Sequence, residues 1–89
     1  MLHIVKSQSS LENAIPYIDI RDTIALIEDA VYCLNPKHYL YPLLGARPVF
    51  AVEADLSARG ITGIICPDSI INFRDLVRLT VLHTPCTTW

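Results

Sequence analysis

The sequence predicts an α/β fold, a single small three-layer domain at residues 1–89 with a mostly parallel sheet of about four strands flanked by helices. Short apolar runs alternate with segments that carry helix start and stop signals, which is typical of βαβ units. Two runs are apolar at consecutive positions, as expected for central strands that are buried on both faces. A domain of this size is expected to fold with a modest margin of stability.

Four apolar runs are the candidate strands. The first extends from Leu2 to Lys6 and the second is Thr23–Ile27. The third is Pro48–Val52, because proline is tolerated at the first position of a strand. The fourth is placed at Ser69–Ile71, with Ile64–Ile65 as a competing position.

Helix signals lie between the first two strands and shortly after the second. Ser9 followed by Glu12 three residues later predicts a capping box at the start of a helix. Pro16 removes a backbone donor, so we expect this helix to be short or kinked. After the second strand, Val31–Cys33 can form a helical turn.

Prolines and glycines bound the next two predicted helices. Pro36 suits the first turn of a helix that Gly45 ends, and Pro42 inside it is expected to bend it. Asp55 is expected to cap a brief helix that Gly60 ends.

The last predicted helix precedes an aromatic chain end. Asn72 with Asp75 three residues on opens this helix, whose apolar face is predicted to hold Leu76, Val77, Thr80 and Val81. The tail ends at Trp89, a large apolar residue that disordered ends rarely carry. We expect Trp89 to pack against its own domain or against a neighbouring subunit.

Composition excludes several classes of function. Hydrophobic residues make up 52% of the chain and charged residues 18%, so there is more apolar surface than a small core can bury, which predicts oligomerisation. The net charge is −2 and the seven Lys and Arg are scattered, which argues against direct nucleic-acid binding. No apolar stretch is long enough for a membrane span and no signal peptide is evident, so a cytoplasmic location is expected.

The three cysteines show no pattern of a metal or disulfide site, and a reducing compartment fits them. A relay thiol needs a lowered pKa, usually from a nearby cation. Cys33 follows Glu28–Asp29. The side chains of these two adjacent acids would point in different directions, so we interpret them as solvated or helix-capping carboxylates and not as an acid/base pair. Cys33 itself is interpreted as a buried hydrophobe. Cys66 lies beside Asp68, and Cys86, in the tail, is expected to be the most exposed.

We therefore assign no catalytic residue and keep Cys66 and Cys33 as weak thiol candidates. His3, His38 and His83 lack ligand spacing, so no metal is predicted, and His3 is expected to be a satisfied core histidine. No glycine-rich phosphate loop occurs, and no cofactor is predicted.

Four segments, in order along nearly the whole chain, resemble the DsrH/TusB family. They comprise Met1–Val5, Leu26–Tyr32, Val52–Leu56 with Ala58–Ile61, and Leu76–Val81 with His83 and Trp89. The resemblance implies a DsrEFH-like fold with flavodoxin-like layering. It implies a non-catalytic structural subunit of a sulfur-relay complex acting in 2-thiolation of the tRNA wobble uridine.

The partners implied by this resemblance are TusC-like and TusD-like subunits in a hetero-hexamer, with a TusA-like sulfur carrier upstream. In such complexes the relay cysteine generally belongs to the DsrE- or TusD-like subunit. Some DsrH-like members carry a cysteine between the first helix and the second strand, whereas Tyr17–Asp22 contains none here. Trp89, Tyr32 and Tyr41 are the candidate interface anchors, because aromatic residues dominate interface energetics.

Three alternatives stay open at this point. One is a stand-alone thiol sulfurtransferase that uses Cys66 or Cys33, and another is a DsrEFH-type subunit in sulfur oxidation. The third is a homo-oligomeric α/β protein without sulfur chemistry, and a homo-oligomer is also an alternative for the isolated chain.

Overall fold

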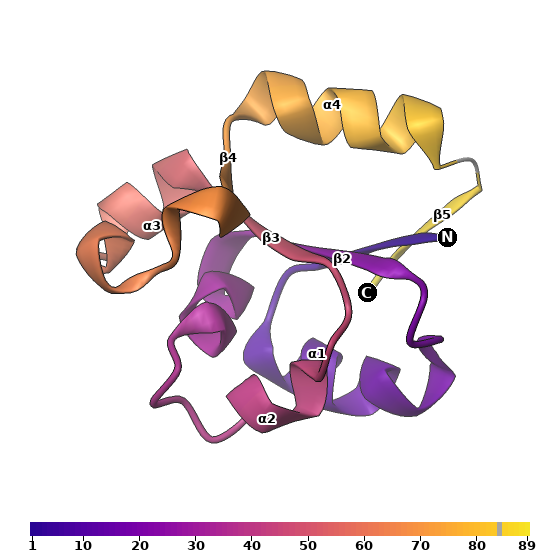
Figure 1. Cartoon of the computed structure of the whole chain (residues 1–89), viewed down its shortest axis with the longest axis horizontal. Helices are drawn as coiled ribbons and strands as arrows, with labels where there is room; N and C mark the ends of the chain where they lie inside the picture. The colour runs from indigo at the N-terminus through magenta and orange to yellow at the C-terminus, as the bar shows by residue number, and fades with distance from the viewer. Residues whose placement is uncertain (84) are drawn as a thin grey trace.

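Five parallel strands form the centre of the computed structural model, which describes residues 1–83 and 85–89 (Figure 1). They are β1 (Leu2–Val5), β2 (Thr23–Leu26), β3 (Val49–Val52), β4 (Ile70–Ile71) and β5 (Cys86–Thr88), in the order β4-β3-β2-β1-β5. Every neighbouring pair is parallel. The predicted α/β class with a parallel sheet is confirmed, with one strand more than predicted.

The additional strand is the tail after the last helix. β5 pairs with β1 in the register Leu2 to Cys86, and the backbone N–H of Trp89 donates to Ile4 O at 2.7 Å. Its sequence, Cys-Thr-Thr, has no apolar alternation, because an edge strand exposes much of its surface to water. Residues 86–89 are therefore joined to the sheet.

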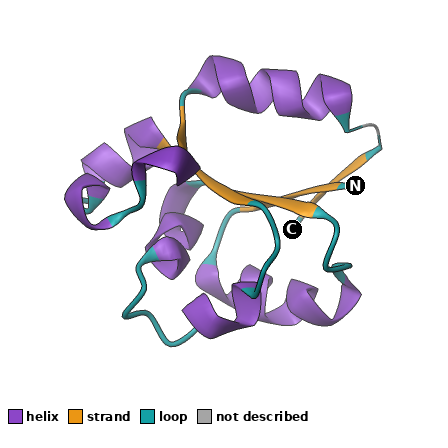
Figure 2. Ribbon diagram, viewed as in Figure 1, coloured by secondary structure: helices purple, strands orange, loops and turns teal. Residues whose placement is uncertain are grey.

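Helices cover both faces of the sheet (Figures 1 and 2). One face carries α1 (Gln8–Ala14), η1 (Ile15–Tyr17), η2 (Glu28–Leu34), α2 (Tyr41–Leu44) and α3 (Glu53–Ala58), followed by the 3₁₀ turns η3 (Thr62–Ile64) and η4 (Pro67–Ser69). The other face is covered by α4 (Phe73–Leu82). This asymmetry leaves the outer side of α4 without a second layer in the described part of the chain.

Side chains on the two opposite faces of the sheet form two hydrophobic cores of unequal size. The larger core lies on the α1 side and includes Val5, Ile24, Leu26 and Ala51. The smaller one is formed by Leu2, Ala25, Val52 and Leu76, between the sheet and α4. Because β2 is buried at all four positions, its prediction as a central strand from consecutive apolar residues is confirmed.

The first helix begins two residues earlier than predicted. Ser7 is its N-cap, and the Ser7 hydroxyl oxygen accepts a hydrogen bond from the Ser10 N–H at 3.1 Å. The predicted box of Ser9 with Glu12 was wrong, because β1 ends at Val5 and the chain turns into the helix at once. The run of serines offered several possible caps, so the pattern located the helix but not its first residue.

The helix predicted from Pro36 to Gly45 is reduced to α2. In the segment before α2, side-chain acceptors bind backbone N–H groups that a longer helix would use. Asn35 Oδ1 accepts from Lys37 N–H, and His38 Nδ1 accepts from Leu40 N–H. Such local bonds compete with helical ones. Pro42 consequently lies in the first turn of α2, where its missing N–H costs nothing, and does not bend a longer helix.

Later boundaries follow the predictions more closely. α3 starts at Glu53, directly after β3, so Asp55 lies within its first turn and is not its cap as predicted. Asn72 and Asp75 form the predicted capping box of α4. Ile64 belongs to η3, so the competing position for the fourth strand is wrong and β4 is Ile70–Ile71.

Candidate functional site

The three cysteines occupy different environments. Cys33 is fully buried in η2, and burial raises the pKa of its thiol to about 11. Its interpretation as a buried hydrophobe is confirmed. Cys66 and Cys86 are exposed, and no hydrogen bond to either sulfur is present among the described residues. These two thiols are therefore accessible to reagents, whereas that of Cys33 is not.

Selective alkylation tests this placement. We expect iodoacetamide at a pH of about 8 to label Cys66 and Cys86 in the folded chain and to leave Cys33 unmodified until denaturant is added. Intact-mass spectrometry would show two adducts before unfolding and three afterwards. Three adducts on the native chain would contradict the buried position of Cys33.

Acidic residues and an arginine meet where β2 and β3 end. The Glu28 N–H donates to Asp55 Oδ2 at 2.9 Å, which holds Glu28 at a positive φ of 51°. Arg59 donates two hydrogen bonds to Asp29 Oδ1, at 2.8 and 3.0 Å. Its guanidinium also lies 6.0 Å from the centre of the Tyr32 ring. The Glu28 backbone and the Asp29 carboxylate thus have separate partners, and the ring of Tyr32 already contacts its own chain.

The chain end packs against its own domain, which confirms one of the two placements expected for Trp89. The indole N–H donates to His3 Nδ1 at 3.0 Å, and the ring stacks on Tyr17 with 6.1 Å between centroids. Because the indole can only donate, His3 Nδ1 is an acceptor and Nε2 carries the proton. His3 Nε2 then donates to Asp22 Oδ2 at 2.9 Å.

Asp22 completes what we call the terminal network, formed by Met1, His3, Asp22 and Trp89. The amino group of Met1 donates to Asp22 Oδ1 at 3.1 Å. Burial acts to raise the pKa of Asp22, but hydrogen bonds from His3, the Met1 amine and the Asp19 N–H outweigh it and lower the pKa to about 2. The network joins both chain ends to the sheet, and it contains no nucleophile.

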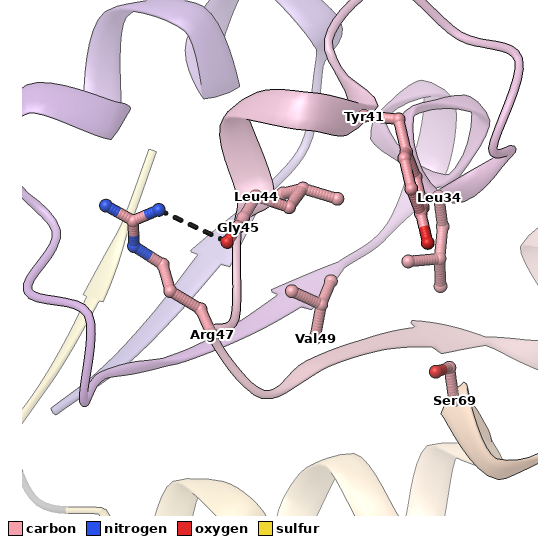
Figure 3. Close-up of a pocket in the computed structure, with 7 residues that line it drawn as sticks. All are labelled: Leu34, Tyr41, Leu44, Gly45, Arg47, Val49 and Ser69. Carbon is pink, nitrogen blue, oxygen red and sulfur yellow. Dashed lines mark hydrogen bonds between the residues drawn. The ribbon is translucent and has the colours of Figure 1, made fainter.

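A shallow pocket of about 130 Å³ lies between α2 and β3 (Figure 3). Tyr41 lines it, together with Leu34, Leu44, Gly45, Arg47, Val49 and Ser69. The Arg47 guanidinium lies on the far side of Leu44 from Tyr41 and donates instead to the carbonyls of Leu43, Leu44 and Ile18. A second hollow, of about 380 Å³, is lined by Asn35, Pro36, Lys37 and Ile64. Neither pocket is lined by a cysteine.

The outer side of α4 carries four exposed large hydrophobic side chains. We call it the α4 surface, and its residues are Phe73, Arg74, Val77, Arg78, Val81 and Leu82. Leu76 and Leu79 point into the smaller core, whereas Val77 and Val81 are exposed. Val77 and Val81, which were predicted to share an apolar face with Leu76, are not buried with it, because the sheet covers only the row centred on Leu76 and Leu79.

The described residues give no support for other classes of site. No helix among residues 1–83 and 85–89 is long and apolar enough to cross a membrane. No group of three or more His, Cys, Asp or Glu side chains in that part of the chain is placed to hold a metal ion.

Fold and surface together define a small parallel α/β domain in which one helix, α4, exposes an apolar row. A family model described as "DsrH like protein" matches residues 6–85. The chain therefore belongs to the DsrH family.

Curated relatives and a solved structure agree with this assignment. A protein named TusB from Escherichia fergusonii is 42% identical over 71 residues, which cover 76% of this chain and 75% of that protein. A TusB from Escherichia coli O1:K1 is 41% identical with the same coverage. The crystal structure of the ychN protein from E. coli is similar with a TM-score of 0.74, covering 99% of this chain and 97% of that one. At 18% identity this last likeness shows the fold alone.

The terminal network is the feature that sequence reasoning missed, although it placed His3 in the core. The signal was available in the strand register: pairing Leu2 with Thr23 brings Met1 and His3 close to Asp22. The partner of His3 on the other side, Trp89, depends on β5, which was not predicted.

Proposed function

We propose that this chain is a non-catalytic structural subunit of a sulfur-relay complex that acts in 2-thiolation of the tRNA wobble uridine in the cytoplasm. The partners would be TusC-like and TusD-like subunits in a hetero-hexamer, with a TusA-like carrier supplying the sulfur. The observation that carries the proposal is the exposed α4 surface on a chain similar to proteins named TusB. Its role would be to bury partner surface and to shape the pocket around a partner's thiol.

The thiol chemistry supports an accessory role. Persulfide transfer needs a thiolate, and the raised pKa of Cys33 keeps that thiol protonated at neutral pH. Cys66 and Cys86 are accessible, but no hydrogen bond to either sulfur is present among the described residues. A partner subunit would therefore supply the relay cysteine.

Persulfide loading tests this division of labour. The chain is co-expressed with the TusC-like and TusD-like proteins of its host, purified, and loaded from a persulfide donor. We expect mass spectrometry to find the added sulfur on a partner and none on Cys33, Cys66 or Cys86. The double variant C66S/C86S should transfer sulfur at the wild-type rate, and loss of the chain should abolish 2-thiouridine in tRNA.

The exposure of Cys66 favours one alternative, a stand-alone thiol sulfurtransferase. Stable labelling of Cys66 in the isolated chain, with loss of transfer in C66S, would replace the proposed function by this one. Normal tRNA thiolation combined with impaired sulfur oxidation in a deletion strain would favour a DsrEFH-type role.

A further inference from the structure

The α4 surface consists of two parallel rows of different chemistry. Residues four apart in a helix lie one above the other. Phe73, Val77 and Val81 therefore form an apolar row, and the row beside it holds Arg74, Arg78 and Leu82. Phe73 is 70% and Leu82 77% exposed, so both rows face away from the sheet.

Within the described part of the chain, carboxylates neutralise the positive charges of Arg74 and Arg78 only poorly. Arg78 approaches Asp75 only to 4.0 Å, and both side chains are largely exposed, so this pair contributes little. The Asp75 carboxylate also accepts a hydrogen bond from the Asn72 N–H in the capping box. Arg74 makes no ion pair with any residue that the structure describes. The surface thus presents an apolar row with two adjacent positive charges.

Charge argues against a second copy of this chain as the occupant. A two-fold contact between two α4 surfaces would bring Arg74 and Arg78 of both copies into one interface. Like charges brought together in a desolvated contact oppose association. Asp75, the only carboxylate of α4, is occupied in the capping box.

The shape of the surface argues for a folded partner. α4 is a ten-residue helix, about 15 Å long, that stands out from the sheet as a convex ridge. A stable interface buries at least about 1,200 Å² in total, more than a single peptide helix can bury against so short a ridge. A partner with a groove can receive the apolar row and extend beyond α4.

We infer that the α4 surface binds a folded partner subunit whose apolar groove is bordered by Asp and Glu side chains, and does not bind a second copy of this chain. The apolar row fills the groove, and the carboxylates pair with Arg74 and Arg78. This inference rests on the proposed function, because the partner is sought among the related subunits of the complex.

Binding measurements on surface variants test the inference. Full-length wild type, V77D, R74E/R78E and the control K37E are each titrated with the co-purified TusC-like and TusD-like subunits. Lys37 is exposed between η2 and α2, on the opposite face of the sheet. We expect V77D and R74E/R78E to weaken binding by at least about tenfold and K37E to bind as wild type.

Salt separates the charge contribution from folding defects. Glu at positions 74 and 78 is compatible with the helix, because Glu is a good helix former and position 74 also lies in the first turn, where an anionic side chain is favourable. Raising NaCl from about 50 to about 300 mM should weaken wild-type binding several-fold and should leave the milder variant R74Q/R78Q almost unaffected. Circular dichroism checks that each variant is folded.

Each outcome has one meaning. If wild type binds and both surface variants bind equally well, the assigned surface is wrong while the proposed function stands. If the isolated chain forms a dimer that V77D dissociates, a second copy is the occupant and the inference is overturned. If wild type binds neither related subunit, the proposed function fails and the inference fails with it.

Discussion

Replacing Asp22 by alanine is expected to lower the free energy of unfolding by about 3 kcal/mol at neutral pH. The carboxylate accepts hydrogen bonds from the Met1 amine, the buried His3 ring and the Asp19 N–H. Alanine would leave the His3 Nε2–H without its acceptor in a site where only 3% of His3 is exposed. Urea unfolding followed by the fluorescence of Trp89, the single tryptophan, measures the change.

The same carboxylate predicts how stability depends on acid. The pKa of Asp22 is about 2 in the folded chain against 3.8 ordinarily, so the unfolded chain binds its proton first as the pH falls. The stabilisation is fully present above about pH 4 and disappears as the pH falls through about 2, a loss of about 2 kcal/mol.

The matched control for this acid effect is D22N, which keeps an acceptor oxygen but does not titrate. The difference in unfolding free energy between wild type and D22N should shrink by about 2 kcal/mol between about pH 5 and pH 2. A difference that stays constant over this range would show that the carboxylate is not held in the charged form.

The sequence located the buried part of the fold well. Consecutive apolar residues in Thr23–Ile27 identified β2 because a strand covered on both faces needs apolar side chains at every position. The capping box of Asn72 and Asp75 was equally clear, because it depends only on residues three apart. Both signals are local, and neither depends on the position of another element.

What could not be predicted depends on distant partners. Cys86–Thr88 becomes a strand only because β1 offers a free edge, and the segment itself carries no strand pattern. The Asp55 carboxylate does not cap its own helix but accepts a hydrogen bond from the N–H of Glu28, which is 27 residues away in the sequence. Which row of α4 faces outward is set by the sheet, so periodicity alone could not show that Val77 is exposed while Leu76 is buried.

Trp89 yields the second large effect, since the residue combines apolar packing with a buried hydrogen bond. W89A is expected to reduce the free energy of unfolding by about 3 kcal/mol, somewhat less than for a fully buried tryptophan because the side chain is partly exposed. W89F keeps a ring against Tyr17 but loses the N–H that His3 Nδ1 accepts, and should reduce it by about 1 kcal/mol. Urea unfolding followed by circular dichroism serves for both variants, which lack the fluorophore.

The two variants also decide what Trp89 is for. If its role is to hold β5 on β1, the loss should appear in stability, and partner binding by folded W89F should equal that of wild type. If instead Trp89 is an interface anchor, W89F should keep most of its stability and bind the partner subunits about tenfold more weakly. The hydrogen bond to His3 and the stacking on Tyr17 favour the first result, because both use the indole within its own chain.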